Sequence, residues 1–306
     1  DDLDSWQKAI QSNTKAFFAE SISNPKNDVL DIEGVAKVAH DYGVPLIIDN
    51  TVATPYLVRP LEWGADFVVH SATKYLGGHG TAIAGCLVDG GTFDFAKYPE
   101  RYPNYNQPDP SYHGLVYARD LGVNGVFGVN LSFILKARVQ LLRDLGPAAA
   151  PFNAFLIAQG IETLSLRVQR HTDNALAVAQ WLEKHPQVLS VNYAALPSSP
   201  WHERAKKYAP KGTGGVLSFE IDGGVDAIIL EQRHRHAGNR RRLHVWEGAF
   251  QYRQATHADD GLDLPGLDER HDDGRAFGDE RGVAELFRLR LEVLDRAKAA
   301  LLAKQA

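Results

Sequence analysis

The first third of the chain alternates between two patterns of hydrophobic positions. The segment 31–42 spaces its apolar residues three, one and three apart, which is typical of one helical face, and Gly43 is the expected end of that helix. Short apolar runs typical of buried strands occur at 14–20, 44–48, 67–69 and 82–88. Strands joined through helices and short links predict an α/β fold with a mostly parallel sheet flanked by helices.

The rest of the chain differs in composition and in its hydrophobic pattern. Residues 94–130 are rich in aromatics, proline and glycine, and we expect an ordered insertion there. Further elements are predicted as helices over 131–145, 153–170 and from a cap at Thr172 or Asp173 to Leu182, and as strands over 188–193 and 216–221. From 231 to 281 the chain is dense in Arg, His, Asp and Gly with little periodicity, and only 283–304 regains a helical pattern.

Composition narrows the class of protein. The 306 residues are 44% hydrophobic and 23% charged, which is typical of globular chains of one large domain or two. The net charge of −5 is no basic footprint for nucleic acid, and we find no apolar run long enough for a membrane span. We therefore expect a soluble cytoplasmic protein. The single cysteine, Cys86, lies in an apolar run, where we expect it in the core. Because methionine is absent, we expect the true N-terminus to precede Asp1.

The segment 66–80 carries the strongest chemical signal. Lys74 follows small hydroxyl residues just after a buried strand, and glycines come after it. Partial desolvation of a lysine lowers its pKa and frees the amine as a nucleophile, and the hydroxyls of Ser71 and Thr73 can donate to a phosphate. An isolated lysine of this kind is more often an ordinary surface residue in a glycine-rich turn. Other residues of the predicted sheet are therefore needed to choose between the two interpretations.

Two upstream residues favour the chemical interpretation. Asp49 ends one predicted strand and Asn24 follows another, so both belong to the carboxyl ends of parallel strands, where open α/β sheets bind ligands. Lys74 also follows such a strand. A lysine, a carboxylate and hydroxyl donors at one sheet edge suit pyridoxal 5′-phosphate (PLP), whose aldehyde needs a lysine and whose ring nitrogen needs a carboxylate.

These residues carry a resemblance to a known family. Residues 14–225 resemble the Cys/Met-metabolism PLP-dependent enzymes, and the segment 66–80 matches the lysine signature of that family. The equal spacing of 25 residues from Asn24 to Asp49 and from Asp49 to Lys74 is also that of the family. The resemblance implies the aspartate-aminotransferase fold, with a partial α+β C-terminal domain.

The resemblance also implies a role for each candidate residue. Lys74 would be the catalytic residue and would bind the cofactor covalently, and Asp49 would pair with the pyridine nitrogen. Ser71 and Thr73 would bind the phosphate, and Asn24 would contact the ring or the substrate. The implied domains are a partial large domain over 1–160 with the insert 94–130, the start of a small domain over 161–225, and an atypical tail over 226–306.

Within the family, the segments 107–114 and 154–164 resemble O-acetylhomoserine sulfhydrylase. The implied reaction is replacement of the acetate of O-acetylhomoserine by sulfide, giving homocysteine for methionine biosynthesis, with Lys74 as general base and acid. A homotetramer is implied as well. The alternatives are a cystathionine γ-synthase or γ-lyase, and an inactive fragment of such an enzyme.

The tail departs from the family pattern. Segments 250–254 and 264–270 can be encoded so that a shift of one base restores stretches of that pattern, so our hypothesis is a frameshifted tail. The arginines of 233–242 are expected to form a solvated face, and a nucleic-acid-binding protein is the alternative. The nearby His234, His236 and His244 lack an accompanying cysteine or ordered carboxylates, and we expect no metal site.

Overall fold

The computed structural model describes residues 2–221, 241–246 and 249–251. The chain divides into two compact units. The first comprises Asp1–Leu176 and Asn192–Val216, and the second comprises Ala177–Val191 and Leu217–Ala306. No helix among the described residues is long and apolar enough to cross a membrane.

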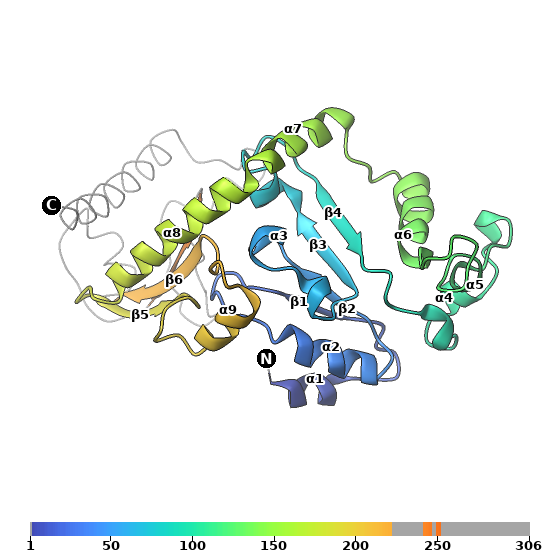
Figure 1. Ribbon diagram of the computed structural model, residues 1–306, viewed down its shortest axis with the longest axis horizontal. Helices are drawn as coiled ribbons and strands as arrows, with labels where there is room; N and C mark the ends of the chain where they lie inside the picture. The colour runs from blue at the N-terminus through green and yellow to red at the C-terminus, as the bar shows by residue number, and fades with distance from the viewer. Residues whose placement is uncertain (1, 222–240, 247–248, 252–306) are drawn as a thin grey trace, which may run out of the picture. The chain divides into compact units, whose positions relative to one another are not determined.

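A four-stranded sheet is the centre of the first unit, with the order β1-β2-β3-β4 (Figure 1). Its strands are β1 (Phe17–Glu20), β2 (Leu46–Asp49), β3 (Phe67–Ser71) and β4 (Gly85–Asp89). The first three strands run parallel, whereas β4 pairs antiparallel with β3. The predicted mostly parallel sheet is confirmed, and the carboxyl ends of β1, β2 and β3 lie side by side.

Helices and short helical turns connect these strands and continue beyond them. Before and between the strands lie α1 (Leu3–Ala9), α2 (Ile32–Asp41), α3 (Thr54–Leu57), the 3₁₀ helix η1 (Pro60–Trp63) and the π-type turn η2 (Ala72–Leu76). After β4 come η3 (Phe95–Lys97), α4 (Pro103–Asn106), η4 (Pro110–Tyr112), α5 (Tyr117–Asp120), α6 (Ser132–Lys136), η5 (Ala137–Asp144), α7 (Pro151–Glu162), α8 (Leu164–Leu182) and α9 (His202–Tyr208).

One face of the sheet is packed against α2, which lies beside α1 (Figure 1). The predicted helix is confirmed, and the side chain of Asp31 caps it by accepting from the amide of Gly34. Its apolar stripe and the facing strand residues form one buried cluster that includes Ile32, Val35, Ala36, Ala39, Phe17, Leu46 and Ile48. Burial of this stripe explains why the helical period is so clear in the sequence.

The opposite face of the sheet is only partly covered. Phe18 is 59% exposed and Leu87 is 37% exposed. Near the amino ends of the strands this face is closed by Phe67, whose ring stacks on Phe133 at 3.8 Å, and by aromatic residues of the predicted insertion. The hydroxyl of Tyr102 donates to backbone carbonyls that precede β1 and β2, so the insertion is an ordered part of this unit.

Two expectations from the sequence are wrong. No helix begins at Thr172 or Asp173, because α8 runs without interruption from Leu164 to Leu182. Its buried residues Leu164, Val168, Ala175, Ala179 and Leu182 stay on one helical face through that point. Cys86 is exposed rather than in the core, because β4 lies at the edge of the sheet and pairs, within the described residues, only with β3.

The second unit contains a sheet with the order β5-β6-β7-β8. Its strands are β5 (Val188–Asn192), β6 (Val216–Ile221), β7 (Arg241–Trp246) and β8 (Ala249–Gln251), of which β7 and β8 are antiparallel. The first two confirm the predicted strands. The hypothesis of a frameshifted tail concerns segments that, apart from β7 and β8, lie outside the described residues, as do His234 and His236.

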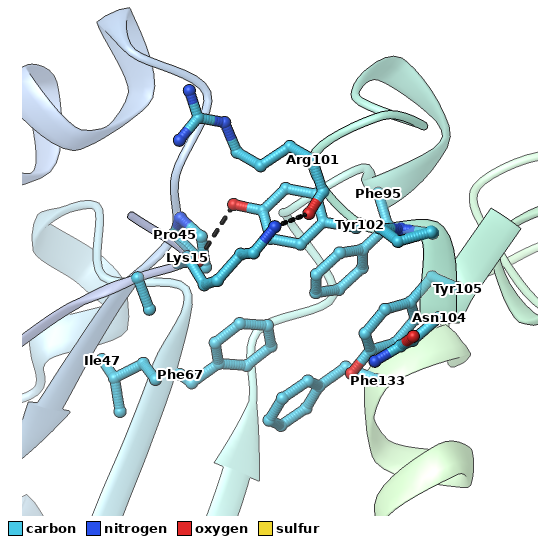
Figure 2. Close-up of a pocket in the computed structure, with 12 residues that line it drawn as sticks. Lys15, Pro45, Ile47, Phe67, Phe95, Arg101, Tyr102, Asn104, Tyr105 and Phe133 are labelled. Atoms are coloured by element: carbon cyan, nitrogen blue, oxygen red, sulfur yellow. Dashed lines mark hydrogen bonds between the residues drawn. The ribbon is translucent and has the colours of Figure 1, made fainter. Parts of the chain in front are cut away.

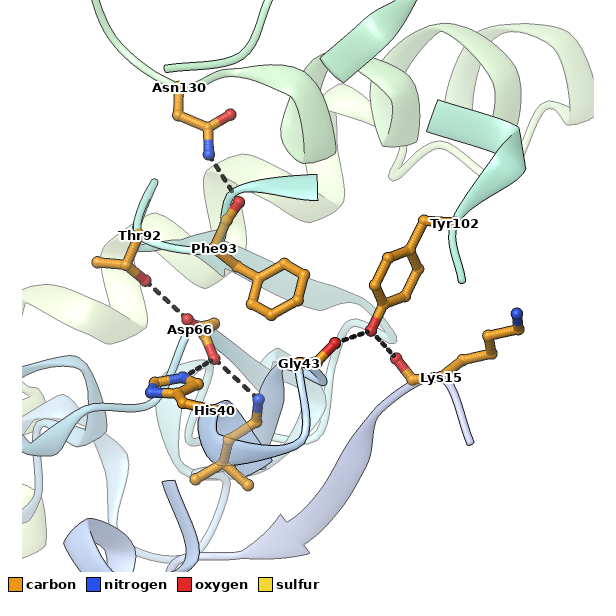
Figure 3. Close-up of polar contacts among 9 residues, drawn as sticks. Lys15, His40, Gly43, Asp66, Thr92, Phe93, Tyr102 and Asn130 are labelled. Atoms are coloured by element: carbon orange, nitrogen blue, oxygen red, sulfur yellow. Dashed lines mark hydrogen bonds and ion pairs between the residues drawn. The ribbon is translucent and has the colours of Figure 1, made fainter. Parts of the chain in front are cut away.

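A buried carboxylate fixes the start of β3. Asp66 accepts hydrogen bonds from the Nε2 of His40 at 2.8 Å, the amide of Leu46 at 2.9 Å and the hydroxyl of Thr92 at 2.9 Å (Figure 3). The hydrogen bond to Asp66 raises the pKa of His40 above its ordinary value of 6.5, although partial burial opposes the shift. This network ties α2, β2 and the loop after β4 to one carboxylate.

We expect the stability of the first unit to depend on pH through His40. Since the folded state has the raised pKa, the contribution of this pair is complete below pH 6.5 and is lost as the pH rises through the folded pKa. Urea unfolding of the native chain and His40→Gln from pH 6 to 9 should show a decline that the variant lacks. Parallel profiles for the two proteins would contradict the assignment.

Candidate functional site

Three parallel strands deliver the predicted site residues to one edge of the sheet. Asp49 is the last residue of β2 and Ser71 the last of β3, and the pairing of Asp49 with Val69 puts both side chains on the same face. Asn24 is exposed in the loop after β1, where its backbone amide donates to the carboxylate of Glu20 at 2.9 Å. The structure thus places Asp49 and Ser71 at one edge of the sheet and Asn24 in the loop after the strand beside β2.

The loop after β2 joins Asp49 to the end of β3. Thr51 donates its amide to Oδ1 of Asp49 at 2.9 Å, and its hydroxyl accepts from the amide of Ser71 at 2.8 Å. One oxygen of the Asp49 carboxylate is thereby fixed, and no hydrogen bond from the described residues engages the other. Thr51 was missed by the sequence reasoning, since a threonine two residues after a strand carries no signal of its own.

Lys74 occupies an unusual turn directly after β3. It is exposed, and its backbone angles of φ −90° and ψ −124° lie outside the helical region although η2 surrounds it. The amide of Gly78 donates to its carbonyl at 2.8 Å, which closes the turn. Non-helical backbone within a helical turn is a constrained arrangement that is typical of functional positions.

Thr73 is held by Ala84, the residue that precedes β4. Its hydroxyl donates to the carbonyl of Ala84 at 3.3 Å and accepts from the amide of Ala84 at 3.1 Å. The single hydroxyl proton is therefore used within the protein. The same hydroxyl can give a phosphate its proton only by releasing Ala84, whereas no such contact engages the hydroxyl of Ser71 within the described residues. The phosphate roles of both residues stay predictions.

Arg167 of α8 supports the turn 72–78 that bears Lys74, here called the lysine turn. The sequence reasoning missed this residue. Its guanidinium donates to the carbonyls of Tyr75 at 2.9 Å, Leu76 at 3.3 Å and Gly160 at 2.7 Å. Burial of this cation lowers its pKa. Gly78 has φ +73°, and a Cβ there would lie 2.3 Å from the guanidinium. Arg167 is thus a positioning residue that clamps the turn bearing Lys74 to α7 and α8.

We expect Arg167→Lys to weaken this clamp, because one ammonium cannot reproduce three hydrogen bonds from a planar fork. The loss should be about 1–3 kcal/mol in urea unfolding, the cost of leaving buried carbonyls unpaired. Reactivity of Lys74 toward PLP, measured at an equal folded fraction, should fall as well. The matched control is Arg170→Lys on the exposed side of α8. Normal Lys74 reactivity in folded Arg167→Lys would contradict the positioning role.

His70 lies on the other face of β3, beneath the site. It is 6% exposed, and its Nδ1 has no hydrogen-bond partner within the described residues. Burial lowers its pKa, an effect opposed by a hydrogen bond to the backbone of Asn50 and by the charge of Asp49. The imidazole is therefore neutral at neutral pH, and it adds no positive charge beside the Asp49 carboxylate.

Two cavities of the described residues lie elsewhere. A pocket of about 290 Å³ opens at the amino ends of the strands, between Ile47 and Phe67 on the sheet and the aromatic rings of the insertion (Figure 2). Lys15 and Arg101 stand at its side, where Lys15 donates to the carbonyl of Arg101. A second pocket of about 330 Å³ lies between α8 and α9. Neither is lined by Lys74 or Asp49.

Solved structures with a similar fold show which class of protein this chain belongs to. A crystal structure of a putative O-acetylhomoserine (thiol)-lyase from Campylobacter jejuni, which holds a pyridoxyl-lysine phosphate, superimposes with a TM-score of 0.65 at 43% identity, covering 72% of this chain and 53% of that one. The O-acetylhomoserine sulfhydrylase of Wolinella succinogenes gives a TM-score of 0.60 at 35% identity, with 72% and 58% covered. The fold is that of PLP-dependent enzymes, as predicted.

Residues 1–240 match the pattern of the Cys/Met metabolism PLP-dependent enzymes, and the chain belongs to that family. It is 54% identical over 264 residues to the O-acetyl-L-homoserine sulfhydrylase of Leptospira meyeri, covering 83% of this chain and 59% of the relative. It is 48% identical over 268 residues to the enzyme of that name from Corynebacterium glutamicum, covering 84% and 60%. The chain thus spans about six tenths of the length of these curated relatives.

The residues at the sheet edge fit the cofactor of this family. A lysine on a constrained turn has the kind of amine that the aldehyde needs, and Asp49 has the carboxylate that a ring nitrogen needs, with one of its oxygens held by Thr51. The hydroxyl of Ser71 lies at the end of the adjacent strand, whereas its backbone amide already donates to Thr51. No group of three or more His, Cys, Asp or Glu residues suited to a metal occurs among the described residues.

Proposed function

We propose that this chain carries the cofactor-binding region of a PLP-dependent O-acetylhomoserine sulfhydrylase. The observation that supports it most strongly is the arrangement of Lys74, Asp49 and Ser71 at the ends of adjacent parallel strands, in a chain 54% identical to a curated sulfhydrylase. The substrates are O-acetylhomoserine and sulfide, and the product is homocysteine for methionine biosynthesis.

In this proposal each residue of the site has its own role in the reaction. PLP, when bound, supplies the electron sink that makes the protons at Cα and Cβ of the substrate acidic. The Nζ of Lys74 takes and returns those protons while acetate leaves from Cγ and sulfide adds there. The carboxylate of Asp49 holds the proton on the ring nitrogen, and Ser71, Thr73 and Asn24 orient the cofactor and substrate.

The proposal also covers the cellular location and the oligomeric state of the protein. By analogy with its family, the protein acts in the cytoplasm as a homotetramer. The partly covered face of the sheet, where Phe18 and Leu87 are exposed, supports association with further protein. Sedimentation of the purified chain measures the assembly, and a monodisperse monomer would contradict it.

The decisive experiment is reconstitution of the chain with PLP, followed by an assay with O-acetylhomoserine and a choice of acceptor. Homocysteine formed from sulfide supports the proposal. Product formed with cysteine in preference to sulfide favours a cystathionine γ-synthase, and turnover of cystathionine favours a γ-lyase. Binding of PLP to Lys74 without turnover of any substrate identifies an inactive fragment of the family.

A further inference from the structure

The loop that carries Asn24 is closed on itself by hydrogen bonds. It connects β1 to α2 over residues 21–30. The amide of Ser23 donates to the carbonyl of Asp28 at 2.9 Å, and the hydroxyl of Ser23 accepts from the amide of Asp28 at 3.0 Å. The amide of Asn27 donates to the carbonyl of Ser23 at 2.9 Å. Asn24 lies inside this closed turn, so its position depends on where the turn is anchored.

The side chain of Asn27 anchors this loop to a distant part of the first unit. Its Nδ2 donates to the carbonyl of Thr213 at 2.9 Å, and its Oδ1 accepts from the amide of Ala194 at 2.7 Å. These partners lie 186 and 167 positions further along the chain. Asn27, Thr213 and Ala194 are all fully buried. Without the carboxamide, two buried backbone groups lose their partner, which is costly.

Few residues fit the position of Asn27. Its φ of +57° lies in the left-handed region, which asparagine tolerates better than most residues with a side chain. Asparagine and glutamine have a side-chain amide that both donates and accepts, and the carboxamide does both at this position. Glycine would suit the backbone but would make neither bond. Asparagine thus meets the backbone conformation and both hydrogen bonds together.

The segment 209–214 also contacts the loop after β2. The Nζ of Lys211 lies 4.1 Å from the centre of the Tyr56 ring. Gly214 has φ +83°, and a Cβ there would lie 3.4 Å from the carbonyl oxygen of Val52. One segment of the first unit therefore supports the loops after β1 and β2, both of which begin at the edge of the sheet where the cofactor is proposed to bind.

We propose that Asn27 is a positioning residue for the cofactor edge of the sheet and acts through Asn24. It holds the loop after β1 against Thr213 and Ala194, and it thereby fixes the place at which Asn24 meets the cofactor ring or the substrate. Because these two backbone groups already use its carboxamide, Asn27 takes no part in the chemistry itself. The inference rests on the proposed function, which gives Asn24 that contact.

The test is a double-mutant cycle of Asn27→Gly and Asn24→Ala, with kcat/KM for homocysteine formation measured at equal folded fraction. Asn27→Gly keeps the left-handed backbone and removes both hydrogen bonds. Each single variant should lower kcat/KM by about 10²-fold, the cost of a misplaced contact. The double variant should be no slower than Asn24→Ala, since one contact cannot be lost twice. Losses that multiply would overturn the inference, as would an unchanged kcat/KM in Asn27→Gly.

Asn130→Gly is the matched control. Asn130 also donates to a backbone carbonyl, that of Phe93 at 2.8 Å, and accepts from the amide of Ser132 at 3.3 Å (Figure 3). Its loss should lower stability and leave kcat/KM native at equal folded fraction, and an equal loss of kcat/KM would reduce Asn27 to a structural role. If Asn27→Gly does not fold, Asn27→Asp replaces it in the cycle, because an ionised carboxylate accepts from an amide but cannot donate to a carbonyl.

Hydrogen exchange of the chain without cofactor separates this inference from the proposed function. In Asn27→Gly the amides of Ala194 and Asp28 should exchange at least about tenfold faster than in the native chain, because the anchor is lost. Unchanged exchange would overturn the anchor even in an active enzyme. If the native chain binds no PLP at Lys74 and forms no homocysteine, the proposed function fails, whereas faster exchange in Asn27→Gly would still support the anchor.

Discussion

Replacing Lys74 by alanine is expected to abolish stable attachment of PLP and to lower sulfhydrylase turnover at least about 10³-fold. In the proposed roles, Lys74 is both the amine that bonds the cofactor and the base that moves the substrate protons, and positioned acid–base groups alone contribute about 10²–10⁴-fold. The measurement is borohydride reduction after addition of PLP, with the label mapped by mass spectrometry. The native chain should carry a pyridoxyl group on Lys74.

The control for this prediction is Lys97→Ala, which removes another exposed lysine and should keep both label and turnover. Lys74→Arg sharpens the test because it retains the positive charge without a nucleophilic amine. Label scattered over surface lysines in the native chain would show that the site does not form in this chain. Full turnover by Lys74→Ala would exclude the assigned role.

Gly160→Ala is expected to destabilise the first unit by about 2 kcal/mol and to reduce the labelling of Lys74. Alanine is the better helix former by about 1 kcal/mol, so propensity alone predicts a gain. A Cβ at Gly160 would, however, lie 2.1 Å from the carbonyl oxygen of Gly77 and 2.7 Å from its carbon. Because the neighbour is backbone, α7 and the lysine turn must separate, and such overpacking costs about 1–3 kcal/mol or more.

Urea unfolding measures this balance directly. Gln159→Ala is the matched control, since it changes an exposed neighbour on the same helix and should be nearly neutral. If Gly160→Ala proves more stable than the native chain, helix propensity outweighs the close approach, and the packing of α7 on the lysine turn is not essential. If stability falls while Lys74 labels normally, the contact supports the fold alone.

Some features of the chain were determined by local sequence. The apolar runs of β1, β2 and β3 and the stripe of α2 have the periods of their elements, because each element buries one defined set of side chains. Lys74 and Asp49 were predicted as site residues because polar residues directly after buried strands meet at the same edge of a parallel sheet, and the family resemblance then implied their roles. Those inferences need only the order of elements along the chain.

Other features depend on partners that are distant in the sequence. The turn that bears Lys74 is clamped by Arg167, whose bond to the carbonyl of Tyr75 joins residues 92 positions apart. The exposure of Cys86 follows from the edge position of β4, and the same apolar run would be core in a central strand. Neither fact has a local signature, because periodicity records which residues are apolar and not which neighbours cover them.

By itself, therefore, the sequence determined the order of the elements of the parallel sheet and the family, and it predicted which residues would hold the cofactor. Only the tertiary structure decided how the turn that bears Lys74 is held against α7 and α8. The physical reason is that strand and helix patterns arise from burial within one element. Contacts such as those of Arg167 form instead between elements that are distant in the sequence, and the spacing of apolar residues within one element does not predict them.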